Sequence, residues 1–297
     1  MFGIGYEGGG AVRSRTEVYL AADVVGWPEA QAALLQLKRI YTIFNRLNFG
    51  QSMKVRNPKN RFDLSIGRKE RVLEVGGGHN PHPRANIETD KFTDSNYHRS
   101  GDFKLLDHQE FVPAEGEALP FKDKEFDYVI CCHVLEHAED PHQFLQEQFR
   151  VAKRGYIETP SLLGEVLAAR ESHRWILHEF NDVLYIVDKQ KINFQPGSVN
   201  LMELMQDYLP KHSIGFKMVE RTHANLMTVR IEWKDNFRYE VDPTDPAILQ
   251  YFTSQWKESW GPAFFPEKSM GRELKDSMAA FMDITRSVFR SKVLKKK

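Results

Sequence analysis

The sequence has few cysteines and no long apolar run. Cys131 and Cys132 are the only cysteines among its 297 residues. Neighbouring residues of a strand point to opposite faces, so we expect two free thiols and no disulfide between them. Two adjacent cysteines also lack the separated ligand pairs of a zinc site. No stretch of about 18 apolar residues is present, and we therefore expect no membrane span.

The sequence also lacks an excess of charge of either sign. Lysine and arginine together number 41, as do aspartate and glutamate, so the formal net charge is zero. This balance gives no global reason to expect nucleic acid or an anionic membrane as a partner. The N-terminus has no basic segment followed by an apolar run, as a secretory signal would have. We therefore expect a cytoplasmic globular protein.

The chain divides by pattern into a central region and two flanks. Apolar residues recur at helical spacing over residues 28–47, and residues 267–293 have a helical pattern as well. The region between them contains short apolar segments instead. We therefore predict an N-terminal helical extension over 1–60, an α/β core over 61–240 and a C-terminal helical extension over 241–297, all within one compact domain.

Short apolar segments of the core predict strands. These strands are expected at residues 71–75, 85–90, 126–132, 155–159, 215–220 and 226–233, with a helix over 141–151. Alternating strands and helices are typical of a parallel α/β sheet. The near-continuous apolar run FDYVICC at 126–132 indicates a strand buried on both faces. The last two strands are expected to form an antiparallel edge of a mostly parallel sheet.

A glycine-rich turn and two acidic residues open the core. In VLEVGGG, Glu74 lies in a strand, and Gly76, Gly77 and Gly78 let the backbone approach a ligand closely. Asp90 stands at the end of the next strand, where a carboxylate can accept hydrogen bonds from both hydroxyls of a ribose. An acidic residue in the first strand can reach an amino group of the same ligand.

Two more motifs follow in order. EGEALPF at 115–121 sets Glu115 beside a turn, where it could accept the amino group of adenine while apolar neighbours such as Ala118 cover the ring. The buried strand at 126–132 then leads into the sequence HVLEH at 133–137. Open α/β sheets bind ligands at this end of their strands.

The ordered set of four motifs resembles the class I, Rossmann-like methyltransferases that use S-adenosylmethionine. LPFKDKEFDYVICCHVLEHAEDP at 119–141 is similar to a sequence block of the type-11 group, and the resemblance covers about residues 70–162. It implies a seven-stranded sheet with S-adenosylmethionine across its C-terminal edge. It places Glu74 and the turn Gly76–Gly78 near the methionine part, Asp90 at the ribose, Glu115 near the adenine and His133 near the sulfonium.

The sequence departs from this family after the glycine turn. Members usually have a full helix before the ribose-binding acid, whereas the segment from Gly78 to Ala85 is short and contains two prolines. We expect that helix to be very short or missing, which removes a helix dipole from the cofactor site. Glu88 is the alternative to Asp90 for the ribose.

Methyl transfer from a sulfonium is an in-line displacement that depends chiefly on positioning and desolvation. A hydroxyl acceptor must also lose a proton, for which histidine is suited near neutral pH. The candidate bases are His133, Glu136, His137, Glu158, His173 and His178. Structural roles compete with this one: residues 136 and 137 could cap or anchor the following helix, residue 158 could contact a loop, and residues 173 and 178 could belong to a hairpin. No set of metal ligands is predicted from the spacing.

The expected function is methylation of a hydroxyl on a small molecule or glycan. A nucleic-acid or protein methyltransferase is disfavoured by the neutral charge and by the lack of an Asn/Asp-Pro-Pro-Tyr motif. A catalytically silent scaffold is the third alternative. The terminal extensions would form a lid over the acceptor or a homodimer contact. The aromatic residues between 256 and 265 would stack on a sugar or pack in the core.

Overall fold

The computed structural model describes residues 53–93, 101–195, 197, 201–223 and 225–293. All of them belong to one compact unit, Ser52–Lys297. The helix predicted over 28–47 lies outside the described residues. No helix within the described ranges is long and apolar enough to cross a membrane.

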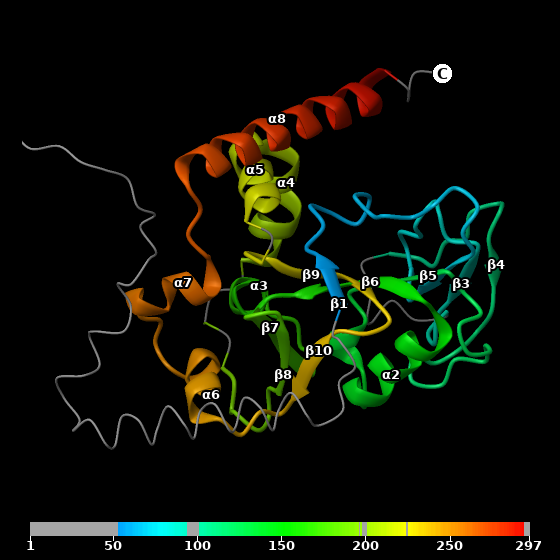
Figure 1. Cartoon of the computed structure of the whole chain (residues 1–297), viewed down its shortest axis with the longest axis horizontal. Coiled ribbons are helices and arrows are strands. Elements are labelled where there is room, and N and C mark those ends of the chain that lie inside the picture. Colours follow the sequence, from blue (N-terminus) through cyan, green and yellow to red (C-terminus); the bar gives the residue numbers. More distant parts are fainter. Residues whose placement is uncertain (1–52, 94–100, 196, 198–200, 224, 294–297) are drawn as a thin grey trace, which may run out of the picture. The chain divides into compact units, whose positions relative to one another are not determined.

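A seven-stranded sheet forms the centre of this unit (Figure 1). In order across the sheet the strands are β1 (Met53–Arg56), β9 (Thr228–Lys234), β6 (Arg154–Pro160), β5 (Tyr128–Cys132), β2 (Val72–Val75), β3 (Ile87–Thr89) and β4 (Glu110–Phe111). The five strands from β6 to β4 in this order are parallel, whereas β9 is antiparallel to both of its neighbours. The antiparallel strand β9 is therefore next to the edge of the sheet, and the edge strand is β1, whose residues precede the predicted core.

The strand order reverses between β2 and β5. From β2 the chain continues to β3 and β4 on one side, then returns to β5 and β6 on the other. In open α/β sheets, ligands bind outside the carboxyl ends of the strands at such a reversal. The α/β class and the mostly parallel sheet predicted from the sequence are confirmed.

β5 is buried on both faces, as its apolar run predicted. Val129 and Cys131 pack in one hydrophobic cluster, whereas Tyr128 and Ile130 pack in another, with Cys132 against the latter. Cys131 and Cys132 are both free thiols. Two buried faces require cover on each side, which is typical of a central parallel strand.

One face of the sheet is covered by α2 (Pro141–Val151), which follows the short 3-10 helix η1 (Leu135–His137). The Asp140 side chain accepts a hydrogen bond from Gln143 N and Pro141 begins the helix, so this start carries two standard N-terminal signals. Phe144 and Leu145 are buried against the sheet. The helix thus has the bounds that the sequence predicted.

A second, three-stranded sheet has the order β10-β8-β7. β7 (Trp175–Phe180) and β8 (Val183–Asp188) form the hairpin expected around His173 and His178, and β10 (Arg238–Val241) runs parallel to β8. A separate cluster that contains Trp260 and Phe264 packs beside it. These two aromatic residues therefore serve the core, and the segments that carry them are α6 (Pro246–Thr253), η3 (Glu258–Trp260) and α7 (Gly261–Phe264).

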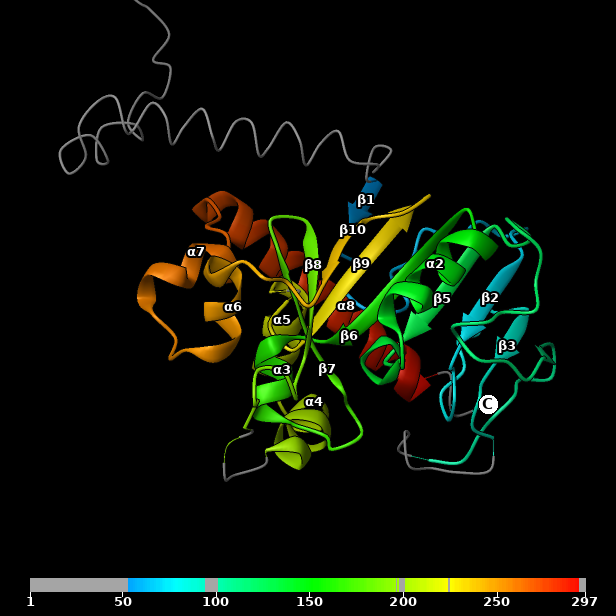
Figure 2. The same cartoon turned by 90° about the horizontal axis from the view of Figure 1, so that it is seen from below.

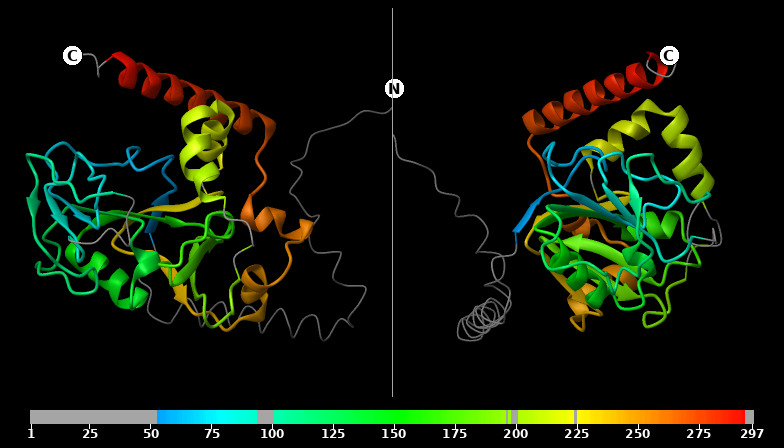
Figure 3. Two further views of the ribbon diagram at one scale, coloured as in Figure 1. Left: turned by 180° about the vertical axis from the view of Figure 1, so that it is seen from behind. Right: turned by 90° about the vertical axis from the view of Figure 1, so that its right-hand side faces the viewer.

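The prediction of a strand at 215–220 is wrong, because these residues belong to helix α5 (Ile214–Thr222). The Ser213 side chain caps it by accepting from Phe216 N, and Arg221 Nε lies 3.2 Å from Asp283 Oδ2 of α8 (Met270–Val293). Packing on α8 therefore overrides the local sequence pattern from which the strand was predicted. Figures 2 and 3 show α8 beside α5. The segment between β6 and α5 also contains α3 (Leu162–Leu167), the π-helix η2 (Glu203–Tyr208) and α4 (Leu209–His212).

Candidate active site

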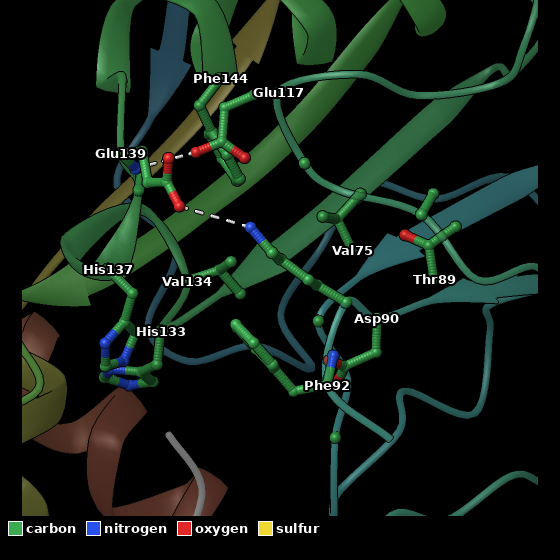
Figure 4. Close-up of a pocket in the computed structure, with 16 residues that line it drawn as sticks. Val75, Thr89, Asp90, Phe92, Glu117, His133, Val134, His137, Glu139 and Phe144 are labelled. Atoms are coloured by element: carbon green, nitrogen blue, oxygen red, sulfur yellow. Dashed lines mark hydrogen bonds and ion pairs between the residues drawn. The ribbon is translucent and has the colours of Figure 1, made fainter. Parts of the chain in front are cut away.

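A cavity of about 210 Å³ lies at the carboxyl ends of β2, β3 and β5 (Figure 4). The predicted residues Gly76, Gly78, Asp90 and His133 line it. Apolar side chains supply much of the remaining wall, which suits a flat aromatic base. These are Val75, Phe92, Val134 and Phe144.

The glycine turn has the close backbone approach that the sequence predicted. Gly76 and Gly78 have φ of +71° and +57°, a conformation that side chains rarely adopt. A Cβ on Gly76 would lie 2.4 Å from Val134 Cγ2, so glycine is required there for space as well. No helix occurs between Gly78 and β3, as expected from the short loop.

Two other predicted cofactor residues lie beneath the turn rather than in the cavity wall. Glu74 is buried, and its carboxylate contacts Arg61 Nη2 at 2.9 Å and accepts a hydrogen bond from His82 N. Gly77 N donates to buried Glu88, the alternative ribose acid. Glu74 and Glu88 thus hold the loop after the glycine turn.

Asp90, the preferred ribose acid, lines the cavity, and its Oδ1 accepts a hydrogen bond from Phe92 N at 2.8 Å. Glu115 does not line it; its carboxylate is half exposed and lies 3.2 Å from Lys91 Nζ. Ala118 is exposed in the same turn and donates its N–H to Glu115 O.

The neighbouring acid Glu117 is a site residue that the motifs of the sequence did not indicate. It lines the cavity, and its Oε1 accepts a hydrogen bond from Glu139 N at 2.9 Å (Figure 4). Lys91 Nζ lies 3.4 Å from Glu139 Oε1, so a cation also reaches this wall. The only available signal was position in the turn, because Glu115 and Glu117 flank the same glycine.

A second cavity, of about 410 Å³, adjoins the first. Gly76, Gly78, His133 and His137 line both cavities, and His173 and Glu158 line the second one only. Its wall includes the cations Arg61, Arg170 and Arg230 together with Asn80, Gln206 and Glu220.

His133 stands at the boundary between the cavities. It follows β5 directly and has φ of +58°, a rare conformation for a residue with a side chain. Its Nδ1 lies 3.3 Å from Glu136 Oε1 and its Nε2 lies 3.8 Å from Glu158 Oε1. Desolvation alone would lower the pKa of His133, but the hydrogen bond to Glu136 and the charges of both carboxylates raise it.

Both carboxylates beside His133 are held in the ionised form. Burial would raise the pKa of Glu136, but the hydrogen bond and charge of His133, with the charges of His173 and His137, lower it to about 2. Burial opposes ionisation of Glu158 too, yet Arg230 and His133 lower its pKa. A base at His133 therefore has two anions to stabilise its protonated form.

His137 and His173 lie edge to face, with ring centroids 4.7 Å apart. His137 Nδ1 is 2.8 Å from Ser172 O, and His173 Nδ1 is 2.7 Å from Glu165 Oε2. The second cavity thus brings together His133, His137, Glu158 and His173, with Glu136 buried beside them, whereas His178 does not line it. These residues come from the loop after β5, the end of β6 and the start of β7.

Known proteins that are similar to this chain include methyltransferases. Residues 88–157 match a family model described as a methyltransferase domain, of the type-11 group. An uncharacterized protein of Methanocaldococcus jannaschii is 46% identical over an alignment of 136 residues, which covers 42% of this chain and 57% of that protein. The chain therefore spans little more than half the length of this relative.

Solved methyltransferase structures resemble parts of the chain. A SAM-dependent methyltransferase of Thermotoga maritima has 19% identity and a TM-score of 0.24, covering 33% of this chain and 46% of that one. A Haloferax volcanii methyltransferase solved in complex with the Trm112 methyltransferase activator has 15% identity and a TM-score of 0.32, covering 58% of this chain and 85% of that one.

Proposed function

We propose that the protein transfers a methyl group from S-adenosylmethionine to a hydroxyl of a small molecule or glycan. The starting point is the class I methyltransferase domain of the type-11 group that this chain carries. The observation that supports this most is the contact between the two cavities. Gly76, Gly78, His133 and His137 line both of them. A donor in the first cavity would thus present its methyl group to an acceptor in the second.

The first cavity has the features that an adenosyl group requires. Asp90 offers a carboxylate for ribose hydroxyls, and the ring of Phe144 offers an apolar wall for adenine. The turn at Gly76 and Gly78 brings backbone within reach of the methionine part. S-adenosylhomocysteine, the product, would occupy the same cavity.

The second cavity favours a polar acceptor with many hydroxyls. Its wall offers carboxylate, amide and guanidinium groups, which can accept from and donate to hydroxyls on several sides. Arg170 and Arg230 would also attract an acidic group on such an acceptor.

His133 is the proposed general base. It takes the hydroxyl proton as the acceptor oxygen forms a bond to the methyl carbon. The carbon–sulfur bond breaks with its electron pair remaining on sulfur, so the sulfonium becomes a neutral thioether. Glu136 and Glu158, which lie beside His133, stabilise the imidazolium that results.

Calorimetric titration with S-adenosylmethionine and S-adenosylhomocysteine tests the donor site. We expect wild-type protein to bind both and a Gly76→Arg variant to bind neither, because its side chain would enter the cavity and its Cβ would overlap Val134. Gly215→Ala is the matched control, since its Cβ meets only Ser213 Oγ at 3.8 Å.

The acceptor is then sought with labelled S-adenosylmethionine and panels of sugars and hydroxylated small molecules. Label transferred to an oxygen by wild-type protein and not by Gly76→Arg supports the proposal. Folded wild-type protein that binds neither nucleoside, with or without sugars present, would overturn it and indicate a scaffold role.

A further inference from the structure

Two histidines on the wall of the second cavity meet a carboxylate that is buried beside them. Glu136, His137 and His173 each offer one potential ligand atom, and these atoms lie within 4.8 Å of one another. Glu136 and His173 are buried and His137 is partly buried. Two imidazoles with one carboxylate can hold a divalent transition-metal ion and leave coordination positions open.

Backbone contacts fix the two segments that carry these residues. Arg174 N donates to Glu136 O at 3.0 Å, so the start of β7 is joined to η1. Trp175 Nε1 donates to Ala138 O at 2.7 Å, one residue beyond His137. These bonds flank the three side chains and hold the backbones of the two segments together.

Each histidine also has a partner that orients its ring. His173 Nδ1 lies 2.7 Å from Glu165 Oε2, and Glu165 is itself ion-paired with Lys189. His137 Nδ1 lies 2.8 Å from Ser172 O, and a carbonyl can only accept, so Nδ1 carries the hydrogen. In the neutral ring the lone pair is then on Nε2. Such outer partners are typical of metal-binding histidines.

The carboxylate of Glu136 is equally well placed. Its Oε1 lies 3.3 Å from His133 Nδ1 and its Oε2 accepts from Thr159 Oγ1 at 3.1 Å. Each carboxylate oxygen has two lone pairs, so both contacts are compatible with a metal bond. Three ligand atoms bound to one ion at about 2.1 Å in tetrahedral geometry are about 3.4 Å apart. Any pair near the 4.8 Å limit must therefore approach by about 1.4 Å when an ion binds, through rotation of the side chains.

We propose that Glu136, His137 and His173 bind one divalent ion of the zinc, cobalt or iron class, with an open position toward the acceptor cavity. Binding of the ion does not depend on the proposed function, whereas the role of the ion in the reaction rests on it. There, the ion would hold the acceptor oxygen and ease loss of its proton to His133. The oxygen then attacks the methyl carbon as sulfur departs with the electron pair.

The test uses the full chain without an affinity tag, treated with a chelator and titrated with Co²⁺ and then Zn²⁺. Calorimetry gives stoichiometry and affinity, and the visible absorption of Co²⁺ reports nitrogen coordination. We expect one ion per chain, and a loss of at least hundredfold in affinity in His173→Asn and Glu136→Gln. Glu165→Gln should lose ten- to hundredfold, since it alters an outer partner only. His212→Asn, an exposed histidine on α4, is the matched control.

Folding and donor binding are checked in the same samples. Zn²⁺ should raise the melting temperature of wild type and His212→Asn, but not of His173→Asn. Each variant should still bind S-adenosylhomocysteine, because His173 does not line the first cavity. Wild-type protein that binds this nucleoside but neither metal ion would overturn the metal site and leave the proposed function standing. Wild-type protein that binds a metal ion but not this nucleoside would overturn the proposed function and leave the metal site standing. Equal metal affinity in wild type and His173→Asn would leave the His173–Glu165 pair as a structural contact only and would also overturn the site.

Discussion

Glu74 and Glu88 are register partners on the neighbouring parallel strands β2 and β3, and both side chains are buried. Arg61 pairs with Glu74. Burial, together with the negative charge of Glu74, raises the pKa of Glu88 to about 10. The folded protein therefore keeps a proton on this pair at neutral pH, beneath the glycine turn that borders both cavities.

Glu88→Gln should make the protein more stable in alkaline solution. Between pH 4.5 and about 10 the folded state holds a proton that the unfolded chain releases, so this group makes stability fall as pH rises. Glutamine has nearly the same shape as glutamic acid, but its side chain does not titrate. The free energy of unfolding from urea titrations should show an advantage of the variant that grows from pH 6 to pH 8, by at most about 1.4 kcal/mol per pH unit.

Glu110→Gln, at an exposed position of β4, is the control for this measurement. Its difference from wild type should be the same at both pH values. An advantage of Glu88→Gln that stays constant or shrinks toward pH 8 would contradict a buried protonated Glu88.

His178→Phe should remove a source of acid sensitivity. His178 lies on β7 between Phe180 and Phe264, with ring centroids at 4.6 and 4.8 Å, and burial lowers its pKa to about 3. Between pH 6.5 and about 3 the unfolded chain takes up a proton that the folded state refuses, so stability is lost as pH falls. At pH 5 this loss is about 2 kcal/mol.

Urea unfolding at pH 7.5 and pH 5.0 measures the effect of His178→Phe. Wild type should lose about 2 kcal/mol more than the variant between these two values, whatever the packing of phenylalanine changes at both. His212→Gln should behave as wild type does. Equal pH dependence of His178→Phe and wild type would mean that His178 is charged or solvated in the folded state.

The parts of the fold that sequence could predict are those with strong local signals. The apolar run at 126–132 predicted that β5 is buried on both faces, and the helical pattern over 141–151 predicted α2 with its bounds. The segment 215–220 was expected to be a strand, but a Ser213 cap and contacts with α8 make it helical. Contacts between distant segments decide that outcome, and a local pattern does not contain them.

The candidate site divides in the same way. The glycine turn and His133 follow from strand ends, because an open sheet gathers such positions at one edge. The choice between Glu115 and Glu117 depends on which way a turn faces. The pairing of His137 with His173 depends on a hairpin that folds back on η1. Neither relationship has a signal in residue spacing.

Gly116→Ala should weaken donor binding with a modest loss of stability. A Cβ on Gly116 would lie 2.2 Å from Phe144 Cε2, and both residues line the first cavity. Phe144 is packed in the core, so its ring cannot move far without cost. We expect the affinity for S-adenosylhomocysteine to fall at least tenfold and unfolding free energy to fall by about 1–3 kcal/mol.

Calorimetry and urea unfolding measure these two quantities for Gly116→Ala. Gly215→Ala, whose Cβ makes only an ordinary van der Waals contact with Ser213 Oγ, should change neither affinity nor stability by a comparable amount. Unchanged nucleoside affinity in Gly116→Ala would show that the ligand does not touch the wall made by Phe144.

His133→Asn should reduce turnover while sparing donor binding. Asparagine tolerates the positive φ at this position better than most residues, so the backbone at the cavity boundary is retained. It cannot accept a proton as imidazole does, and general base catalysis is worth about 10²–10⁴-fold. With an acceptor found in the screen, we expect kcat to fall by that factor while the Kd for S-adenosylhomocysteine changes only a few-fold. His212→Asn should keep both values. A kcat within tenfold of wild type would remove His133 as the base, whereas equal losses in nucleoside affinity and turnover would make it a binding residue for the donor.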